Sequence, residues 1–365
     1  MVVSAPSLRR LEAYEEYLKV KSLYWDEEKG EFVWLDTRLL PFEEVYRRTK
    51  DYNRVARAIK TLEIRGAPAI GVSAAYGMAL AAIYSGAKTV EDLMRDLEKA
   101  YETLRNTRPT AYNLFWALDR VMNRARKEAE KGDADRVREA VLDEAGTIHV
   151  EDVESNIAIG RHGNKLIDNG DVILTHCNTG ALATSGFGTA LGIIRYAWYE
   201  GKKIRVITTE TRPILQGARL NVWELKKEGI PFTLITDGMP GLVFMRGMAD
   251  LAIVGADRII LTGHTANKIG TYMVALAAFD NDKPFYVAAP TSTIQKTYNP
   301  EDIVIEVRDP DEVRTVLGRY PLTLPDVDVF NPSFDITPPR YITGIVTEKG
   351  IAYPPYTKSL PRLLD

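Results

Sequence analysis

The stretch Asp171-Val-Ile-Leu-Thr-His-Cys177-Asn-Thr-Gly-Ala-Leu-Ala-Thr184 decides the fold that this sequence predicts. It reads as a short apolar strand, a sharp turn and the start of a helix, which is the order of a βα unit. In open α/β sheets, ligands bind at the carboxyl ends of the strands. Cys177 is the only cysteine of the chain and stands at that point of the unit.

A thiol beside the free N–H groups of a helix start can be ionised near neutral pH. Asn178, Thr179 and Gly180 can cap the following helix and leave amides directed at an anion. The alternative is a buried, inert cysteine that packs as a small apolar side chain. We interpret His176 as a structural hydrogen-bond donor, because along an extended strand its side chain alternates away from that of Cys177.

After Asn169-Gly170, short apolar runs alternate with helix-compatible stretches. The runs are Val172–Thr175, Ile204–Thr208, Phe232–Thr236, Leu251–Val254 and Phe285–Ala289. Such continuously apolar strands, separated by helices, predict a parallel sheet with helices on both faces. The proline-rich tail from Pro321 is expected to run over the surface or to pack against a partner.

The first part of the chain has mainly helical spacing. Residues 11–20 fit an N-terminal helical arm, and Ser22–Leu40 fits a hairpin around the turn Asp26–Gly30. Val55, Ile59 and Leu62 fall on one helical face. Residues 133–166 continue as amphipathic helix. We therefore expect an α/β protein with two domains: a mainly helical N-terminal domain with a short β hairpin (1–168) and a Rossmann-like parallel-sheet domain (169–365).

Composition narrows the function classes. The 365 residues are 45% hydrophobic and carry a net charge of −3 with dispersed Lys and Arg, which argues against a nucleic-acid surface. No long apolar segment or signal peptide is visible, so we expect no membrane span. One cysteine cannot form an internal disulfide, which favours an intracellular, cytoplasmic protein. Four His and one Cys argue against a zinc cluster, whereas counting leaves magnesium open.

Two arginine motifs lie in the first part. In Arg65-Gly-Ala-Pro-Ala-Ile-Gly71, Gly66 can adopt φ angles closed to other residues and Pro68 suits a first helical turn. The amides there, with the Arg65 guanidinium, can hold a phosphate. In the second motif, Pro109 presents Arg108 at another helix start. The alternative for the first motif is an ordinary corner between two helices with an exposed arginine. The alternative for the second is a capped helix with a solvated arginine.

Three polar motifs follow the apolar runs. Thr209-Glu-Thr-Arg-Pro213 leads to Gln216, whose amide suits sugar hydroxyls, while Glu210 and Arg212 can form a bracing salt bridge. Asp257 follows the run Leu251–Val254. It can be a helix cap, an ion-pair partner or an acid with a raised pKa.

The third motif, Thr265-Ala-Asn267-Lys268, supplies an amide and an ammonium. Cys177, Gln216, Asp257 and Asn267 all follow expected parallel strands, so one crevice can contain them. Arg65, Arg108 and Lys268 are candidates for binding an anionic group of the substrate. The chain has no Rossmann G-x-G-x-x-G and no Walker loop, so we expect no redox cofactor.

Together these stretches resemble the methylthioribose-1-phosphate isomerases of methionine salvage, from about Leu23 to the C-terminus. The tail Asn331-Pro-Ser-Phe-Asp335-Ile-Thr-Pro-Pro339 contributes to the match. The resemblance places the family's catalytic cysteine and aspartate on Cys177 and Asp257. Its substrate-binding positions fall on Arg65, Gly66, Ala67, Arg108, Gln216, Asn267 and Lys268. Thr37 departs from the family pattern, which has Gln there, and the first twenty or so residues extend beyond the common core.

The resemblance implies an isomerase that converts 5-methylthio-α-D-ribose 1-phosphate to 5-methylthio-D-ribulose 1-phosphate. It also implies a homodimer. We expect no cofactor and no metal, and isomerisation needs no net electron transfer. The same fold family includes ribose-1,5-bisphosphate isomerase and the non-catalytic regulatory subunits of translation initiation factor 2B. The intact pair of Cys177 and Asp257 favours an enzyme over a regulatory subunit.

Overall fold

The computed structural model of the chain describes residues 4–108 and 112–364. The chain divides into two compact units. The first contains Met1–Asn156 and Ala181–Gly188, and the second contains Ile157–Gly180 and Thr189–Asp365. None of the helices in the described ranges is both long and apolar enough to cross a membrane.

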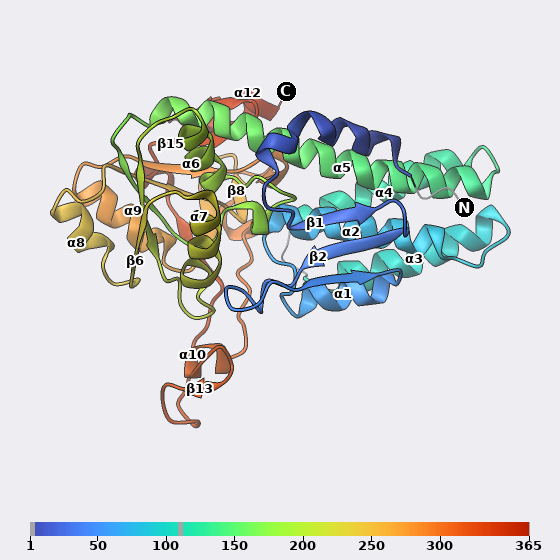
Figure 1. The fold of residues 1–365 in the computed structure, drawn as a ribbon, viewed down its shortest axis with the longest axis horizontal. Helices are drawn as coiled ribbons and strands as arrows, with labels where there is room; N and C mark the ends of the chain where they lie inside the picture. The colour runs from blue at the N-terminus through green and yellow to red at the C-terminus, as the bar shows by residue number, and fades with distance from the viewer. Residues whose placement is uncertain (1–3, 109–111, 365) are drawn as a thin grey trace. The chain divides into compact units, whose positions relative to one another are not determined.

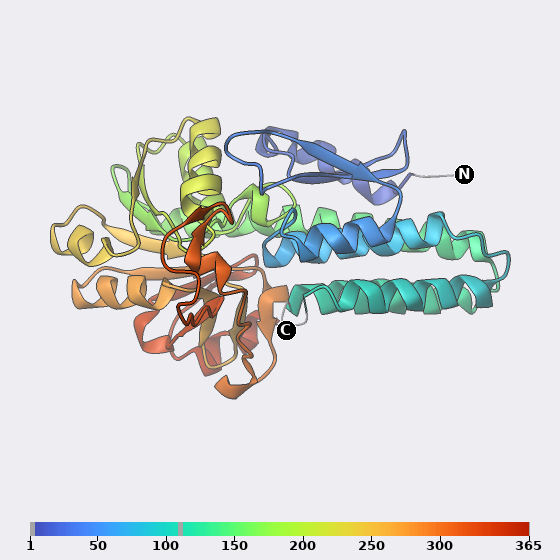
Figure 2. The same ribbon diagram turned by 90° about the horizontal axis from the view of Figure 1, so that it is seen from below.

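A small antiparallel sheet forms one layer of the first unit. The predicted hairpin is confirmed, since β1 (Leu23–Asp26) pairs with β2 (Glu31–Leu35) around the expected turn. A third strand, β3 (Tyr46–Thr49), pairs with β2 and was not predicted. Figure 1 shows β1 and β2 side by side, and Figure 2 shows this sheet as a layer over the blue and cyan helices of its unit.

Helices make up the rest of the first unit. They are η1 (Pro6–Tyr17), α1 (Tyr52–Lys60), α2 (Ala67–Ile83), α3 (Val90–Arg105), α4 (Tyr112–Ala129) and α5 (Ala134–Gly163), which continues beyond Asn156 into the second unit, where η2 (Asn164–Leu166) follows it. The expected arm is therefore a 3₁₀ helix that begins earlier than predicted. The placement of Leu62 on the face of α1 was wrong, because it lies beyond the helix end with a φ of 61°.

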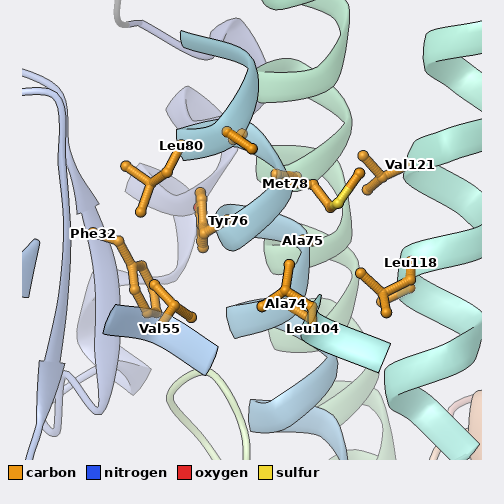
Figure 3. Close-up of a cluster of buried hydrophobic side chains, with 14 of the residues drawn as sticks. Phe32, Val55, Ala74, Ala75, Tyr76, Met78, Leu80, Leu104, Leu118 and Val121 are labelled. Atoms are coloured by element: carbon orange, nitrogen blue, oxygen red, sulfur yellow. The ribbon is translucent and has the colours of Figure 1, made fainter. Parts of the chain in front are cut away.

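The core of the first unit forms around α2. Every residue of α2 except Pro68 is buried, and most of them are small. A Cβ atom on Gly71 would lie 2.9 Å from the carbonyl oxygen of Asn113, so only glycine permits this approach of α2 to α4. Figure 3 shows Phe32 of β2 beside Tyr76, and Met78 beside Val121. The packing of α2 is thus close backbone packing.

The second unit contains the predicted parallel sheet, which confirms the fold class. Its strands are β4 (Val172–Thr175), β5 (Arg205–Thr209), β6 (Phe232–Ile235), β7 (Leu251–Val254), β10 (Phe285–Ala288), β15 (Gly344–Thr347) and β16 (Gly350–Ala352). Their order is β16-β15-β10-β7-β4-β5-β6, and only β16 is antiparallel. Ile173 and Leu174 belong to different hydrophobic clusters, as expected for a sheet buried on both faces.

Helices cover both faces of this sheet. The cluster that contains Ile173 includes residues of α6 (Ala190–Tyr199) and α7 (Val222–Glu228). The cluster that contains Leu174 includes residues of α8 (Pro240–Met245), α9 (Thr271–Asp280) and α11 (Tyr356–Ser359). The remaining helices of the second unit are the π-helical turn η4 (Gly217–Asn221), η5 (Thr291–Thr293), η6 (Pro300–Asp302), α10 (Asp311–Arg314), η7 (Pro339–Tyr341) and α12 (Pro361–Leu364). The short η3 (Ala181–Ala183) belongs to the first unit.

The C-terminal region departs from the expectation of a surface tail. A second sheet has the order β11-β8-β9-β14, with β11 (Ile294–Gln295), β8 (Arg258–Ile260), β9 (Thr265–Lys268) and β14 (Phe334–Thr337). The tail thus supplies β14 and also β15, which is fully buried in the main sheet. Only the excursion with α10, β12 (Thr315–Val316) and β13 (Tyr320–Pro321) projects from its unit (Figure 1).

Candidate active site

Three adjacent strands of the main sheet carry the candidate residues of the second unit. β4 lies between β7 and β5 and runs parallel to both. Cys177 follows β4, Gln216 follows β5, and Asp257 follows β7. The carboxyl ends of parallel strands meet at one edge of a sheet, which is where such sheets bind ligands. These three residues therefore converge on one edge, as the sequence predicted.

Cys177 has an unusual backbone conformation. Its φ angle is 66°, in the left-handed region that non-glycine residues rarely adopt. Its side chain is buried, and its backbone N–H donates to Oγ1 of Thr211 at 3.0 Å. Thr211 has a φ of 64° and donates its own N–H to Oδ1 of Asp237 at 2.8 Å. Hydrogen bonds from the neighbouring strand loop thus hold this conformation.

The imidazole of His176 connects three segments beside Cys177. Nε2 lies 2.9 Å from the carbonyl oxygen of Ile269, which can only accept, so Nε2 carries the proton. Nδ1, at 2.6 Å from Oγ1 of Thr209, then accepts from that hydroxyl. Burial lowers the pKa of His176, which agrees with a neutral ring. The interpretation of His176 as a structural donor is confirmed.

The expected helix start directly after Cys177 was wrong. Only the short η3 follows, and α6 begins at Ala190. The carbonyl oxygen of Thr179 accepts the N–H groups of Thr189 and Leu191, so amides at the start of α6 are bonded to the chain itself. The side-chain amide of Asn178 donates to Asn221 and Glu224.

Gln216 lies in a strained loop between β5 and α7. A Cβ atom on the next residue, Gly217, would lie 1.7 Å from the carbonyl oxygen of Thr209, so glycine alone allows this close turn. Gln216 is 2% exposed, and among the described residues its Oε1 has no hydrogen-bond partner. Buried polar atoms normally have partners, so this oxygen is a candidate contact for a ligand.

Arg212 supports the same loop without the predicted salt bridge to Glu210. Its guanidinium donates to the carbonyl oxygens of Pro213 and Val313 at 2.8 Å and of Thr315 at 3.2 Å. These bonds connect the loop to the excursion of α10 and β12. The loop is thus braced by backbone carbonyls.

Asp257 stands between β7 and β8 and is half-buried. Its N–H donates to the carbonyl oxygen of Ala266 at 2.9 Å, which places it beside β9. Two residues before it, a Cβ atom on Gly255 would lie 2.8 Å from Cγ2 of Thr179. The Asp257 segment therefore lies between the turn after Cys177 and the strand of Asn267.

Asn267 and Lys268 reach the site from β9, so the expectation that Asn267 follows a parallel strand was wrong. Both side chains are buried. The amide of Asn267 donates to Oγ1 of Thr271 at 3.0 Å. Nζ of Lys268 donates to the carbonyl oxygen of Ser333 at 2.9 Å and lies 4.7 Å from the ring centre of Phe334.

Asp335 is a polar group that sequence reasoning left without a role. Its carboxylate accepts the N–H groups of Gly270 at 2.7 Å and Tyr272 at 3.1 Å, at the start of α9. Burial raises its pKa to about 6, although both N–H donors act in the opposite direction. Its place in the tail motif was visible, but the pairing of β14 with β9 that brings it to Gly270 was not.

The remaining candidates belong to the first unit. Gly66 has a φ of 96° and precedes α2, with Pro68 in the first turn as predicted. A Cβ atom on Gly66 would lie 2.3 Å from the carbonyl oxygen of Ala183. Arg65 is half-buried beside it.

Arg108 is also half-buried, before the start of α4. Pro109, which was expected to present it, lies outside the described residues. The approach of Gly71 to Asn113 brings the first turns of α2 and α4 together.

Comparisons with known proteins identify the family. The model of the initiation factor 2 subunit family matches residues 63–354. The methylthioribose-1-phosphate isomerase of Carboxydothermus hydrogenoformans is 48% identical over 343 residues, which are 94% of this chain and 98% of that protein.

Two solved structures are also similar over nearly the whole chain. The crystal structure of 5-methylthioribose 1-phosphate isomerase from Pyrococcus horikoshii has 42% identity and a TM-score of 0.89, covering 96% of this chain and 97% of that one. A structure titled as the delta subunit of translation initiation factor eIF-2B from A. fulgidus has 43% identity and a TM-score of 0.84, covering 95% and 99%. This chain belongs to the initiation factor 2 subunit family and, within it, to the methylthioribose-1-phosphate isomerases.

Proposed function

We propose that this protein isomerises 5-methylthio-α-D-ribose 1-phosphate to 5-methylthio-D-ribulose 1-phosphate. The observation that carries the proposal is the single cysteine, buried in a left-handed conformation at the carboxyl edge of a parallel sheet. Strained residues of this kind cluster at active sites. The isomerase relatives add independent support. We further propose that the enzyme works in the cytoplasm, where a lone thiol stays reduced.

The first step must open the sugar ring. The 1-phosphate blocks simple opening of the ring, so an acid has to protonate the ring oxygen as its bond to C1 breaks. We assign this proton to Asp257, because a carboxylic acid beside the ring oxygen can act as a general acid.

The second step moves hydrogen from C2 to C1. Cys177 acts either as a base that removes the C2 proton and returns it to C1 through an enolate, or as a group that polarises the site while hydride shifts directly from C2 to C1. In both routes the O2 proton leaves as the C2 carbonyl forms, which offsets the proton given to the ring oxygen. Both routes give the ketose with its phosphate retained. Neither transfers electrons to an outside acceptor, so the reaction balances without a redox cofactor.

The remaining candidates bind the substrate. Arg65, Arg108 and Lys268 are cations for the phosphate, and the amides of Gly66 and Ala67 add fixed donors. Gln216 and Asn267 bind sugar hydroxyls. The buried Oε1 of Gln216 supports this assignment, because a substrate hydroxyl would satisfy it.

One assay tests the proposal against its two alternatives. Purified protein is offered 5-methylthioribose 1-phosphate and, separately, ribose 1,5-bisphosphate, and ketose formation is followed by NMR. We expect turnover of the methylthio sugar with a far lower kcat/KM for the bisphosphate. Preference for the bisphosphate would contradict the proposed substrate. Turnover of neither sugar would favour a regulatory subunit, in line with the similarity to the eIF-2B delta-subunit structure from A. fulgidus.

We also propose that the enzyme is a homodimer that associates through an apolar patch on the second unit. The patch consists of exposed side chains on the edge strand β6 and around α8. Its members are Leu234, Met239, Leu242, Met245 and Met248, which are 43–66% exposed. Large apolar patches on an edge strand commonly mark protein contacts.

Light scattering after size-exclusion chromatography tests the dimer. We expect twice the 40.9 kDa mass of one chain. Met245→Glu is expected to give monomers, whereas Phe42→Glu, at an exposed position of the first unit, is expected to stay dimeric. A monomeric wild type would contradict the homodimer, and a dimeric Met245→Glu would contradict the patch as its interface.

A further inference from the structure

A buried ion-pair cluster lies under the turn that follows Cys177. Arg195 of α6 is 1% exposed, and its Nη2 donates to Oε2 of Glu224 at 2.5 Å while Nε donates to Oε1 of Glu228 at 3.1 Å. Burial alone would lower the pKa of Arg195, but the two carboxylates raise it, so the guanidinium stays charged. Tyr199 donates to Oε2 of Glu228 at 2.6 Å at the far side of the cluster.

Asn178 connects this cluster to the turn. Its Nδ2 donates to Oε1 of Glu224 at 2.7 Å and to Oδ1 of Asn221 at 3.0 Å. A Cβ atom on Gly180 would lie 2.2 Å from Oε2 of Glu224, so the carboxylate occupies the space directly against the turn. Glu224 is fully buried. One carboxylate therefore bonds both the turn after Cys177 and the guanidinium of Arg195.

The cluster also reaches the loop of Gln216. Asn221 is the last residue of η4, and Gln216 directly precedes that π-helical turn. Asn221 additionally donates from Nδ2 to Oγ1 of Thr208 in β5 at 3.2 Å. π-Helical turns are rare and occur often at functional sites. Asn178 and Asn221 thus tie the Cys177 turn to the segment that carries Gln216.

Stability alone is a weak reason for such a cluster. Burying charged groups costs desolvation free energy, and apolar side chains of similar volume often give equal or greater stability than a buried ion pair. Geometry is a stronger reason, because Cys177 has a strained φ that its surroundings must hold. Side-chain hydrogen bonds anchor both neighbours of Cys177 in the chain, His176 before it and Asn178 after it.

We propose that Glu224, fixed by Arg195, is a positioning residue of the active site: through Asn178 it holds the Cys177 thiol in place relative to Gln216. The proposal rests on the proposed function of Cys177. Loss of the link lets the turn after Cys177 relax, which displaces the thiol from the substrate and also opens it to reagents. Activity and thiol accessibility then change in opposite directions.

Glu224→Gln tests the link, because it keeps the side-chain volume and leaves Arg195 paired with Glu228. We expect kcat to fall about a hundredfold, the effect of a displacement near 1 Å, with KM within about threefold of wild type. Iodoacetamide can modify only Cys177, the single cysteine, and its rate of reaction with the folded protein is expected to rise roughly tenfold. Asn178→Ser cuts the same link from the turn and should give the same two changes if Glu224→Gln does not fold.

Tyr199→Phe is the matched control, because it removes a bond at the far side of the cluster and leaves Asn178 with its partners. We expect its kcat and alkylation rate to match those of wild type even where its Tm is lower. Unchanged kcat and alkylation in both Glu224→Gln and Asn178→Ser would overturn the proposal. Equal effects in Tyr199→Phe would also overturn it, since they would indicate general loosening. Alkylation needs no substrate, so it tests the positioning even if the wild type turns over neither sugar phosphate.

Discussion

The backbone N–H of Cys177 donates to the hydroxyl oxygen of Thr211 at 3.0 Å, and both residues have left-handed φ angles, 66° and 64°. The same hydroxyl lies 3.1 Å from that of Thr209, which in turn hydrogen-bonds His176. These hydrogen bonds and the peptide bond from His176 to Cys177 form a closed ring that includes the backbone N–H of the cysteine. The left-handed conformation of Cys177 is therefore a property of two neighbouring strand loops.

Thr211→Val should test that ring, since valine keeps the shape and removes the acceptor. A buried N–H without a partner costs about 1–3 kcal/mol, so we expect a lower Tm together with a loss of roughly tenfold or more in kcat. Thr211→Ser keeps the hydroxyl and should retain most of the activity. Kinetics and melting curves of the two variants check this. Equal activity of Val and Ser variants would show that the hydroxyl is dispensable.

Asp257→Asn should be more damaging than its near-identical shape suggests. An amide can donate a hydrogen bond but cannot deliver a proton to the ring oxygen. We expect substrate binding by calorimetry to change little, while the single-turnover rate falls at least about a hundredfold. Isomerisation near the wild-type rate would exclude Asp257 as the essential acid and leave it a structural role beside Ala266.

Arg108→Ala should weaken substrate binding if Arg108 holds the phosphate equally in ground and transition states. Loss of a charge-assisted contact costs about 1.5–3 kcal/mol, so KM should rise roughly tenfold to a hundredfold. The exposed Arg95 on α3 offers a control, because Arg95→Ala should leave KM unchanged. An unchanged KM and kcat/KM in Arg108→Ala would contradict phosphate binding and favour the alternative, in which Arg108 is a solvated arginine at a capped helix start.

Acid should destabilise the first unit through His149. Burial lowers the pKa of His149 to about 4, and its ring bonds the hydroxyl of Tyr76 at 2.9 Å. Because the unfolded chain takes up the proton near pH 6.5 and the folded protein only near pH 4, stability is full above pH 6.5 and falls between these values. The shift corresponds to about 3 kcal/mol.

Urea denaturation between pH 7 and pH 4 measures this effect. We expect His149→Gln to lose less stability on acidification than wild type, although it is less stable at pH 7. His162→Gln, at a partly exposed position, serves as the control and should follow the wild-type slope more closely. If His149→Gln and wild type lose stability in parallel, proton uptake by His149 does not drive the acid sensitivity.

The sequence predicted the parallel strands well because their side chains are buried on both faces. Val172–Thr175 and Leu251–Val254 are strands with the predicted bounds. β3 and β9 were missed because their sequences are polar rather than apolar, and because their pairing depends on partners elsewhere in the chain. Asn267, for example, pairs with Asp335, which no local pattern indicates.

In the candidate site too, local sequence predicted some features, whereas those that depend on distant residues were missed. The position of Cys177 after a strand could be predicted, but its left-handed conformation could not, because bonds to Thr211 and the flanking anchors of His176 and Asn178 produce it. The helix start predicted from Asn178 and Thr179 was also wrong, since only the short η3 follows. The side-chain amide of Asn178 donates to Asn221 and Glu224, which lie more than forty residues away in the chain.

The central claim is that Cys177 carries out the isomerisation, and the direct measurement is turnover of 5-methylthioribose 1-phosphate by wild type and Cys177→Ser, followed by NMR under identical conditions. Serine is close in size, so Tm should change by only a few degrees. We predict that wild type forms the 1-phosphoribulose product and that Cys177→Ser does so at least about a thousandfold more slowly. Turnover by Cys177→Ser close to the wild-type rate, with the fold intact, would contradict the account.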